Sequence, residues 1–127
     1  MASLLDRVEF RPTIASDLEH LTDKPLPFRI KAITAVIGDR VLGVGGIGFM
    51  PDGTTVALAQ MTDEMRSHKV ALHRAAKRFL AEVRASGIRE LVTLADQNIA
   101  GAENWLRHLG FEPVTRNGVR IWLWQTR

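Results

Sequence analysis

The sequence predicts an α/β protein in which a mixed sheet is flanked by helices. Three apolar, β-branched stretches separated by turn residues are followed by a long amphipathic segment, and a further apolar stretch comes after it. That order places a helix between two strands of one sheet. The chain has 127 residues, which suits a single domain over 1–127 whose core needs no metal or disulfide.

Three predicted strands form a meander. Residues 30–37 and 40–49 are apolar and β-branched, and the Gly38-Asp39 dipeptide between them is typical of a hairpin. Pro51, Asp52 and Gly53 then turn the chain into a third strand over 56–62. We expect this meander to form one half of the sheet.

A basic amphipathic helix is predicted to begin at about Val70, after a polar connection over 63–69. Gly87 is well placed as its C-cap. Its apolar face, which we expect to pack on the sheet, comprises Leu72, Ala75, Ala76, Phe79, Leu80 and Val83.

The last part of the chain predicts a strand over 90–95, then a short helix that residues 96–98 can cap and that ends at Gly110. Asn117-Gly118 turns one strand back on the final one.

Trp122 and Trp124 alternate with Ile121 and Leu123 on that final strand, so both indoles project from the same face of the sheet. Core packing is the favoured role. If that face were open, the two indoles would form a surface for a dimer or a ligand.

Composition and charge restrict the function classes. The chain has no cysteine, which excludes disulfides, a thiol nucleophile and thiolate metal sites. It has neither an apolar run long enough to span a membrane nor the features of a signal peptide, so a cytoplasmic protein is expected. The net charge is +3, and most of the excess lies on the long helix. A polyanionic cofactor or a nucleic-acid backbone would suit those charges, although a solvated helix face is the favoured interpretation.

A strand that feeds a connection whose amides open a helix is an anion site, because the first-turn N–H groups have no internal partner and carry the positive end of the helix dipole. Met61 to Ala71 has this order. Its sequence resembles the coenzyme A pyrophosphate loop of the GNAT superfamily of N-acyltransferases, written Gln/Arg-x-x-Gly-x-Gly/Ala. Arg66 and Ala71 match that loop, whereas Lys69 stands where the family has glycine.

The rest of the chain follows the order of that family. Residues 8–13, with an Arg-Pro pair, and 16–21 resemble its opening strand and first helix, and 102–111 resembles its late motif with a closing Gly-Phe. Asn98 lies one residue earlier than the family's spacing, and Leu106 occupies the position where many members carry tyrosine.

The resemblance implies a central mixed, mostly antiparallel sheet and transfer of an acetyl group from acetyl coenzyme A to an amine. The acceptor would be a small-molecule or protein amine. By the resemblance, the residues that would bind the cofactor are Met61, Thr62, Arg66, Ser67, His68, Lys69, Val70, Ala71 and Asn98.

In this family a base deprotonates the amine, and an acid that is often tyrosine protonates the departing thiolate. The chain has no tyrosine, so water, His108 or no acid would serve. The candidate bases are Asp63, Glu64, His68 and His73, each of which is also an ordinary surface residue. No catalytic residue is assigned, and no histidine spacing suggests a metal site.

Two other functions stay open. The second is a GNAT-fold protein that has lost catalysis and acts through binding or assembly; a member that completes its site from a second subunit of a homodimer is an alternative. The third is a small basic nucleic-acid binder, which the sequence does not favour because aromatic and basic residues are not interleaved. Only about sixteen residues separate the opening strand from the first long hairpin strand, which predicts an open acceptor cleft or a missing second helix.

Overall fold

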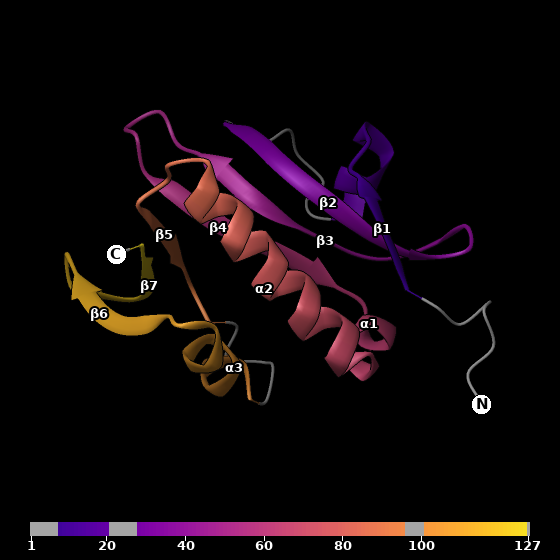
Figure 1. The fold of residues 1–127 in the computed structure, drawn as a ribbon. Coiled ribbons are helices and arrows are strands. Elements are labelled where there is room, and N and C mark those ends of the chain that lie inside the picture. Colours follow the sequence, from indigo (N-terminus) through magenta and orange to yellow (C-terminus); the bar gives the residue numbers. More distant parts are fainter. Residues whose placement is uncertain (1–7, 21–27, 96–100, 127) are drawn as a thin grey trace.

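The computed structural model describes residues 8–20, 28–95 and 101–126 (Figure 1). Within these residues the strands are β1 (Glu9–Pro12), β2 (Arg29–Ile37), β3 (Arg40–Phe49), β4 (Thr55–Met61), β5 (Glu90–Thr93), β6 (Glu112–Arg116) and β7 (Val119–Gln125). The helices are the 3-10 helix η2 (Ala15–His20) and the α-helices α1 (Asp63–Ser67), α2 (Lys69–Ala85) and α3 (Ala102–Leu109).

The strands form one seven-stranded sheet in the order β1-β2-β3-β4-β5-β7-β6. Strands β4 and β5 pair in parallel, and the other neighbours pair antiparallel. The parallel pair needs a crossover connection, which α2 provides as it crosses the sheet (Figure 1). The predicted α/β fold with a mixed, mostly antiparallel sheet is confirmed.

The predicted meander of β2, β3 and β4 is confirmed. Gly38 turns the first hairpin with a φ of +59°, a conformation that glycine adopts without steric cost. Gly46 allows close packing within the sheet, because a side chain there would meet the backbone of Lys31 and Ala32 on β2. The register between β2 and β3 shifts at Ala35 and Val36, which marks a β-bulge.

The prediction of a polar connection over 63–69 is wrong, because residues 63–67 form α1. The hydroxyl of Thr62 caps this helix by accepting a hydrogen bond from the N–H of Met65 at 3.2 Å. Asp63 and Glu64 follow in the first turn, where negative charge is favourable. A threonine followed by two acidic residues is the sequence signal for the start of this helix.

Helix α2 begins at Lys69, one residue before the prediction, and its expected apolar face packs on the sheet. Leu80 and Val83 belong to the main core cluster, together with Leu91 of β5 and Trp122 of β7. Ser86 is the C-cap, one residue before the predicted Gly87, and Gly87 follows it with a φ of +86°.

The N-terminal segment is fixed to the sheet by a buried carboxylate. Asp17 on η2 accepts two hydrogen bonds from Arg11 of β1, at 2.7 and 3.1 Å. It also accepts bonds from the hydroxyl of Thr34 on β2 and from the N–H of Ile14, both at 2.9 Å. The segment predicted as a first helix is a 3-10 helix, and this network joins it to strands β1 and β2.

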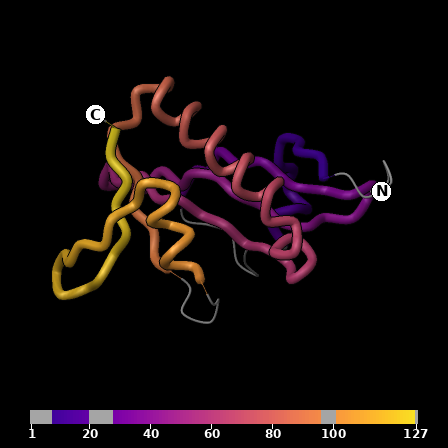
Figure 2. The backbone as a smooth tube through the Cα atoms, turned by 60° about the horizontal axis from the view of Figure 1, so that its bottom comes forward, coloured from indigo at the N-terminus to yellow at the C-terminus, as the bar shows by residue number. Residues whose placement is uncertain are grey.

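The C-terminal half departs from the prediction in two places. Strand β5 ends at Thr93 rather than at residue 95. Helix α3 takes Gly101 as its N-cap, so the expected cap at 96–98 is wrong, and those residues, Asn98 among them, lie outside the described part of the chain. Figure 2 shows the end of the chain beside the segment that joins α2 to β5, where the N–H of Thr126 donates to the carbonyl of Arg89 at 2.9 Å.

Both tryptophans of β7 are buried, Trp122 with 1% and Trp124 with 4% of its surface exposed. Arg107 and Arg120 lie over the Trp122 ring, and Arg84 lies over that of Trp124. The core role predicted for the indoles is confirmed, and the alternative of an open indole surface is wrong.

Candidate functional site

Strands β4 and β5 touch over a short length, and beyond it no strand among the described residues pairs with the β5 side of β4, whose other side pairs with β3. Their ladder is recorded at a single pair, Val56 with Val92. Two side chains also join β4 to β5 where the strands pair: the hydroxyl of Thr93 donates to the carbonyl of Ala57 at 3.1 Å, and the hydroxyl of Thr55 donates to the carbonyl of Glu90. Towards Met61, backbone groups on this edge of β4 can therefore pair with a bound molecule.

The N-terminus of α2 lies shortly after the same end of β4. Lys69, Val70 and Ala71 form the first turn, so their N–H groups have no acceptor within the helix. His68 is the N-cap, and it makes no side-chain capping bond. A helix of 17 residues with an uncapped first turn favours an anion through both its free donors and its dipole.

The turn before α2 is held rigidly by Thr62. Its N–H and its hydroxyl both donate to the carbonyl of Leu42 on β3, at 2.9 and 2.8 Å. The N–H of His68 donates to the carbonyl of Met65 at 3.0 Å, and Met65 is buried against β2 and β3. These bonds fix where the first turn of α2 points, which is the preorganisation that an anion site requires.

The two candidate carboxylate bases are both in ion pairs. Glu64 accepts two hydrogen bonds from Arg40, at 2.6 and 3.1 Å, and these bonds hold the pKa of Glu64 below its usual value. Asp63 pairs with Arg66 within α1. A carboxylate with a lowered pKa is a weaker general base, so the surroundings of Glu64 do not favour that role.

Arg66 and Ser67 complete the predicted loop. The Arg66 side chain is 36% exposed, which leaves part of its guanidinium open to a ligand. The hydroxyl of Ser67 donates to the carbonyl of Glu64 at 2.6 Å. Arg66 therefore stays the strongest side-chain candidate for an anion.

The histidines differ in their freedom to accept a proton. Nδ1 of His73 on α2 accepts a hydrogen bond from the indole N–H of Trp105 on α3 at 3.3 Å, so in the neutral ring Nε2 carries the hydrogen and neither nitrogen is free to act as a base. His108 bonds through Nδ1 to the carbonyl of Asn104 at 2.7 Å, and its ring is exposed. The half-buried ring of His68 lies at the N-cap of α2, next to the candidate anion site.

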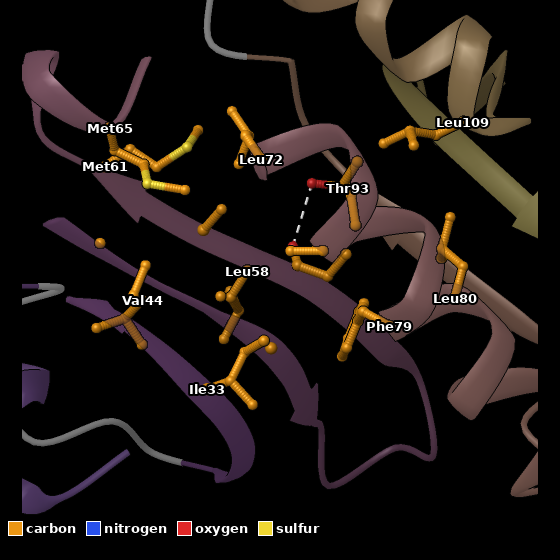
Figure 3. A pocket seen from close by; sticks show the side chains of 18 of the residues that line it. Ile33, Val44, Leu58, Met61, Met65, Leu72, Phe79, Leu80, Thr93 and Leu109 are labelled. Atoms are coloured by element: carbon orange, nitrogen blue, oxygen red, sulfur yellow. Dashed lines mark hydrogen bonds between the residues drawn. The ribbon is translucent and has the colours of Figure 1, made fainter. Parts of the chain in front are cut away.

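An apolar cavity of about 160 Å³ lies between α2, α3 and the sheet (Figure 3). Met61 and Met65 lie at one end of it, and Leu80 and Leu109 lie towards the other. Among the described side chains that line it, Thr93 carries the only hydroxyl, and this hydroxyl donates to the carbonyl of Ala57.

Sequence reasoning missed this cavity. It forms where small residues on β3, β4 and α2 face one another, and the signal was present as glycine and alanine at alternate positions of the two strands. The small lining residues include Gly43, Gly45, Ala57, Ala59, Ala75 and Ala76.

Of the segment from Met61 to Ala71, Met61 and Met65 line one end of the cavity. Leu106 also lines the cavity, and its side chain is 9% exposed within the main core cluster. The family's tyrosine position therefore faces the same space here but offers no proton.

No family model matches the sequence, and no curated protein matches it. The structure is similar to that of a GNAT-family acetyltransferase from Staphylococcus aureus Mu50, with a TM-score of 0.71 and 10% identity over 94% of this chain and 99% of that one. It is also similar to the ribosomal-protein-S18-alanine N-acetyltransferase of Escherichia coli, with a TM-score of 0.69 and 13% identity over 94% of each chain.

A third similar structure is a Bacillus subtilis acetyltransferase in complex with CoA, with a TM-score of 0.65 and 12% identity over 95% of this chain and 99% of that one. At such low identities the likeness establishes the fold alone. The chain has the GNAT fold, and the sequence-based prediction of a divergent GNAT-fold protein is confirmed.

Proposed function

We propose that the chain is an N-acetyltransferase that transfers the acetyl group of acetyl coenzyme A to an amine. The observation that carries this proposal is the uncapped first turn of α2, which lies at the open end of β4 and beside the apolar cavity. On a GNAT fold these features supply an anion site for the pyrophosphate, a backbone edge for the pantetheine amides and a space for the acyl group.

In the proposed reaction the amine nitrogen attacks the carbonyl carbon of the thioester directly. A new C–N bond forms, the C–S bond breaks, and the thiolate of coenzyme A leaves with the electron pair. The attacking nitrogen loses one proton, and the thiolate is protonated by water. Since Leu106 offers no proton, the chain relies on the good leaving ability of the thiolate.

The cofactor residues take separate parts in this proposal. The amides of Lys69, Val70 and Ala71, with the turn at Ser67 and His68, would hold the pyrophosphate, and Arg66 would add charge. Met61 and Thr62 would contribute through the end of β4. Asn98 is proposed as a contact by the family resemblance alone.

Calorimetric titration with acetyl coenzyme A tests the proposal. We expect saturable binding at one site, followed by release of free thiol when a panel of primary amines is added. Absence of binding would overturn both the transferase and any coenzyme A role.

Replacing Arg66 by alanine is expected to weaken coenzyme A binding by roughly 1 to 2 kcal/mol, or about 5- to 30-fold, because a charge-assisted hydrogen bond is lost near the surface. Dephospho-coenzyme A in the same titration separates the pyrophosphate from the 3′-phosphate. Arg74→Ala, at an exposed site on α2, is the control. Equal affinity of Arg66→Ala and wild type would show that Arg66 has no part in the site.

Lys69→Gly tests the position at which the chain departs from the family loop. The Lys69 side chain is exposed and free to turn away from a ligand, so we expect its ammonium to help rather than obstruct. Glycine should weaken binding by about threefold to fivefold at low salt, and the difference should close at high salt. Lys69→Gln, which keeps most of the side chain's length and removes its charge, should weaken binding to the same extent as Lys69→Gly. Tighter binding in the glycine variant alone would show an obstruction instead.

A catalytically inactive GNAT-fold protein that acts by binding or assembly is the second candidate. Two observations favour it: Leu106 replaces the usual acid within the core, and Glu64 is held by Arg40 as a poor base. Binding of coenzyme A without thiol release for any amine would select this candidate.

The partner and the compartment are also proposals. The acceptor is a small-molecule or protein amine, and a cytoplasmic homodimer is our expectation. Val56, Val92 and Leu123 lie in register on the sheet face opposite α2 and stay partly exposed, while Leu94 beyond them is 68% exposed, which supports an apolar contact between copies. Sedimentation equilibrium would decide the oligomeric state. None of the helices in the described part of the chain has the length and apolar character needed to cross a membrane.

A further inference from the structure

The apolar cavity extends further than an acetyl group requires. Besides α2 and β4, it is lined from β2 by Ile33 and Ala35 and from β1 by Phe10. Strand β2 lies two strands away from β4 in the sheet, which amounts to about 10 Å at the usual spacing of neighbouring strands. One arm of the cavity therefore runs beneath α2, across the sheet and away from the edge where β4 parts from β5.

The chemistry of the lining shows what this arm can hold. Pantetheine carries two amides, and burying an amide without hydrogen-bond partners is unfavourable. Within the described part of the chain, the one hydroxyl that lines the cavity, on Thr93, is already bonded to the carbonyl of Ala57. The open edge of β4 offers amide partners, whereas the arm beneath α2 is lined by side chains such as Ile33, Ala76 and Phe79. The arm therefore suits hydrocarbon.

The volume of the whole cavity sets an upper limit on the length of that hydrocarbon. Its volume is about 160 Å³, and a dry apolar cavity of about 150 Å³ in a protein binds benzene, which has six carbons. An acetyl group contributes one methyl group and would leave most of this space empty. An empty apolar space forfeits dispersion contacts, which an occupant would restore.

The geometry points to an acyl-chain pocket: the cavity beneath α2 binds the acyl group of an acyl coenzyme A donor with about six carbons, such as hexanoyl. This inference rests on the proposed function, and it replaces acetyl by a medium-length chain as the preferred donor group. The thioester carbonyl stays at the opening between β4 and β5, and the transfer is the same as for acetyl. The C–N bond forms, the C–S bond breaks, and the thiolate leaves.

Titration of the wild-type chain with coenzyme A, acetyl, butyryl and hexanoyl coenzyme A tests the pocket. Burial of one methylene is worth roughly fourfold in affinity, so the four extra methylenes of hexanoyl set an upper bound of about 250-fold over acetyl. We expect hexanoyl coenzyme A to bind at least about tenfold more tightly than acetyl coenzyme A. Palmitoyl coenzyme A, titrated in the same way, should bind no more tightly than hexanoyl coenzyme A.

Two variants locate the effect in the cavity. Ala76 lines it, so Ala76→Phe places a benzene-sized ring in the space and should remove the preference for hexanoyl while acetyl still binds. Ala81→Phe makes the same change at an exposed position of the same helix and should keep the preference. Gly45→Ala is a gentler change, because its added methyl would lie 3.7 Å from the carbonyl oxygen of Leu58, and it should reduce the preference partially without harm to folding.

Each outcome is decisive. Equal affinity of wild type for acetyl and hexanoyl coenzyme A would overturn the pocket and leave the proposed transferase standing. A preference that persists in both Ala76→Phe and Gly45→Ala would place the acyl chain elsewhere and overturn it too. Failure of every coenzyme A compound, free coenzyme A included, to bind would overturn the proposed function and the pocket together.

Discussion

Replacing Asp17 by asparagine is expected to lower the free energy of unfolding by about 3 kcal/mol, since it breaks a buried hydrogen-bonded charge pair. The carboxylate is 2% exposed and joins η2, β1 and β2 through bonds from Arg11, Thr34 and Ile14. Asparagine would turn an amide group towards at least one of these donors. Arg11 keeps 38% of its side chain exposed, so it can regain water, which keeps the loss below that of a fully buried pair.

The same substitution predicts a dependence on pH. Hydrogen bonds from Arg11, outweighing the cost of burial, hold the pKa of Asp17 well below its usual range. A lowered pKa in the folded state means that the carboxylate stabilises the fold fully above its unfolded value of about 3.9, and that this contribution fades as pH falls below that value. Urea unfolding at pH 7 and at pH 3 should therefore show a difference between wild type and Asp17→Asn that shrinks in acid.

Asp39→Asn, at an exposed position in the hairpin between β2 and β3, is the matched control and should leave the urea midpoint unchanged at both pH values. If Asp17→Asn were as stable as wild type at pH 7, the network would have no role in fixing η2 to the sheet.

Local sequence signals were sufficient for the elements that depend on short-range physics. Turn residues and β-branched runs located the hairpin between β2 and β3, and the period of apolar residues located α2 to within one residue. Helix α1 was missed because the polar residues after Thr62 suit a loop as well as a first helical turn capped by Thr62.

Features that depend on long-range pairing could not be predicted. The ion pair between Arg40 and Glu64 joins residues 24 apart in the sequence, and nothing local indicates that Glu64 is occupied. The parting of β4 from β5 depends on how two strands separated by a whole helix meet. The cavity depends on small residues of β3, β4 and α2 facing one another, which becomes visible only when the register is known.

Leu106→Tyr is expected to raise the rate of thiol release by about 10- to 100-fold with an accepted amine, without tighter binding of acetyl coenzyme A. Leu106 lines the cavity, so a phenol in its place would bring a proton donor to the space where the acyl group is proposed to lie. A positioned acid contributes at or above this range in enzymes. The larger ring fills part of the cavity, which should limit the loss of stability to roughly 1 to 2 kcal/mol.

Leu106→Phe separates proton transfer from packing, because it adds the same ring without the hydroxyl. The prediction requires that Phe leaves the rate at the wild-type level while Tyr raises it, since a phenyl ring cannot protonate the thiolate. Equal gains in both variants would mean that the ring acts by reshaping the cavity. If wild type and both variants bind coenzyme A and release no thiol above background hydrolysis, the missing acid is not what limits the chain. The structure would then support the second candidate, a GNAT-fold protein that acts by binding or assembly.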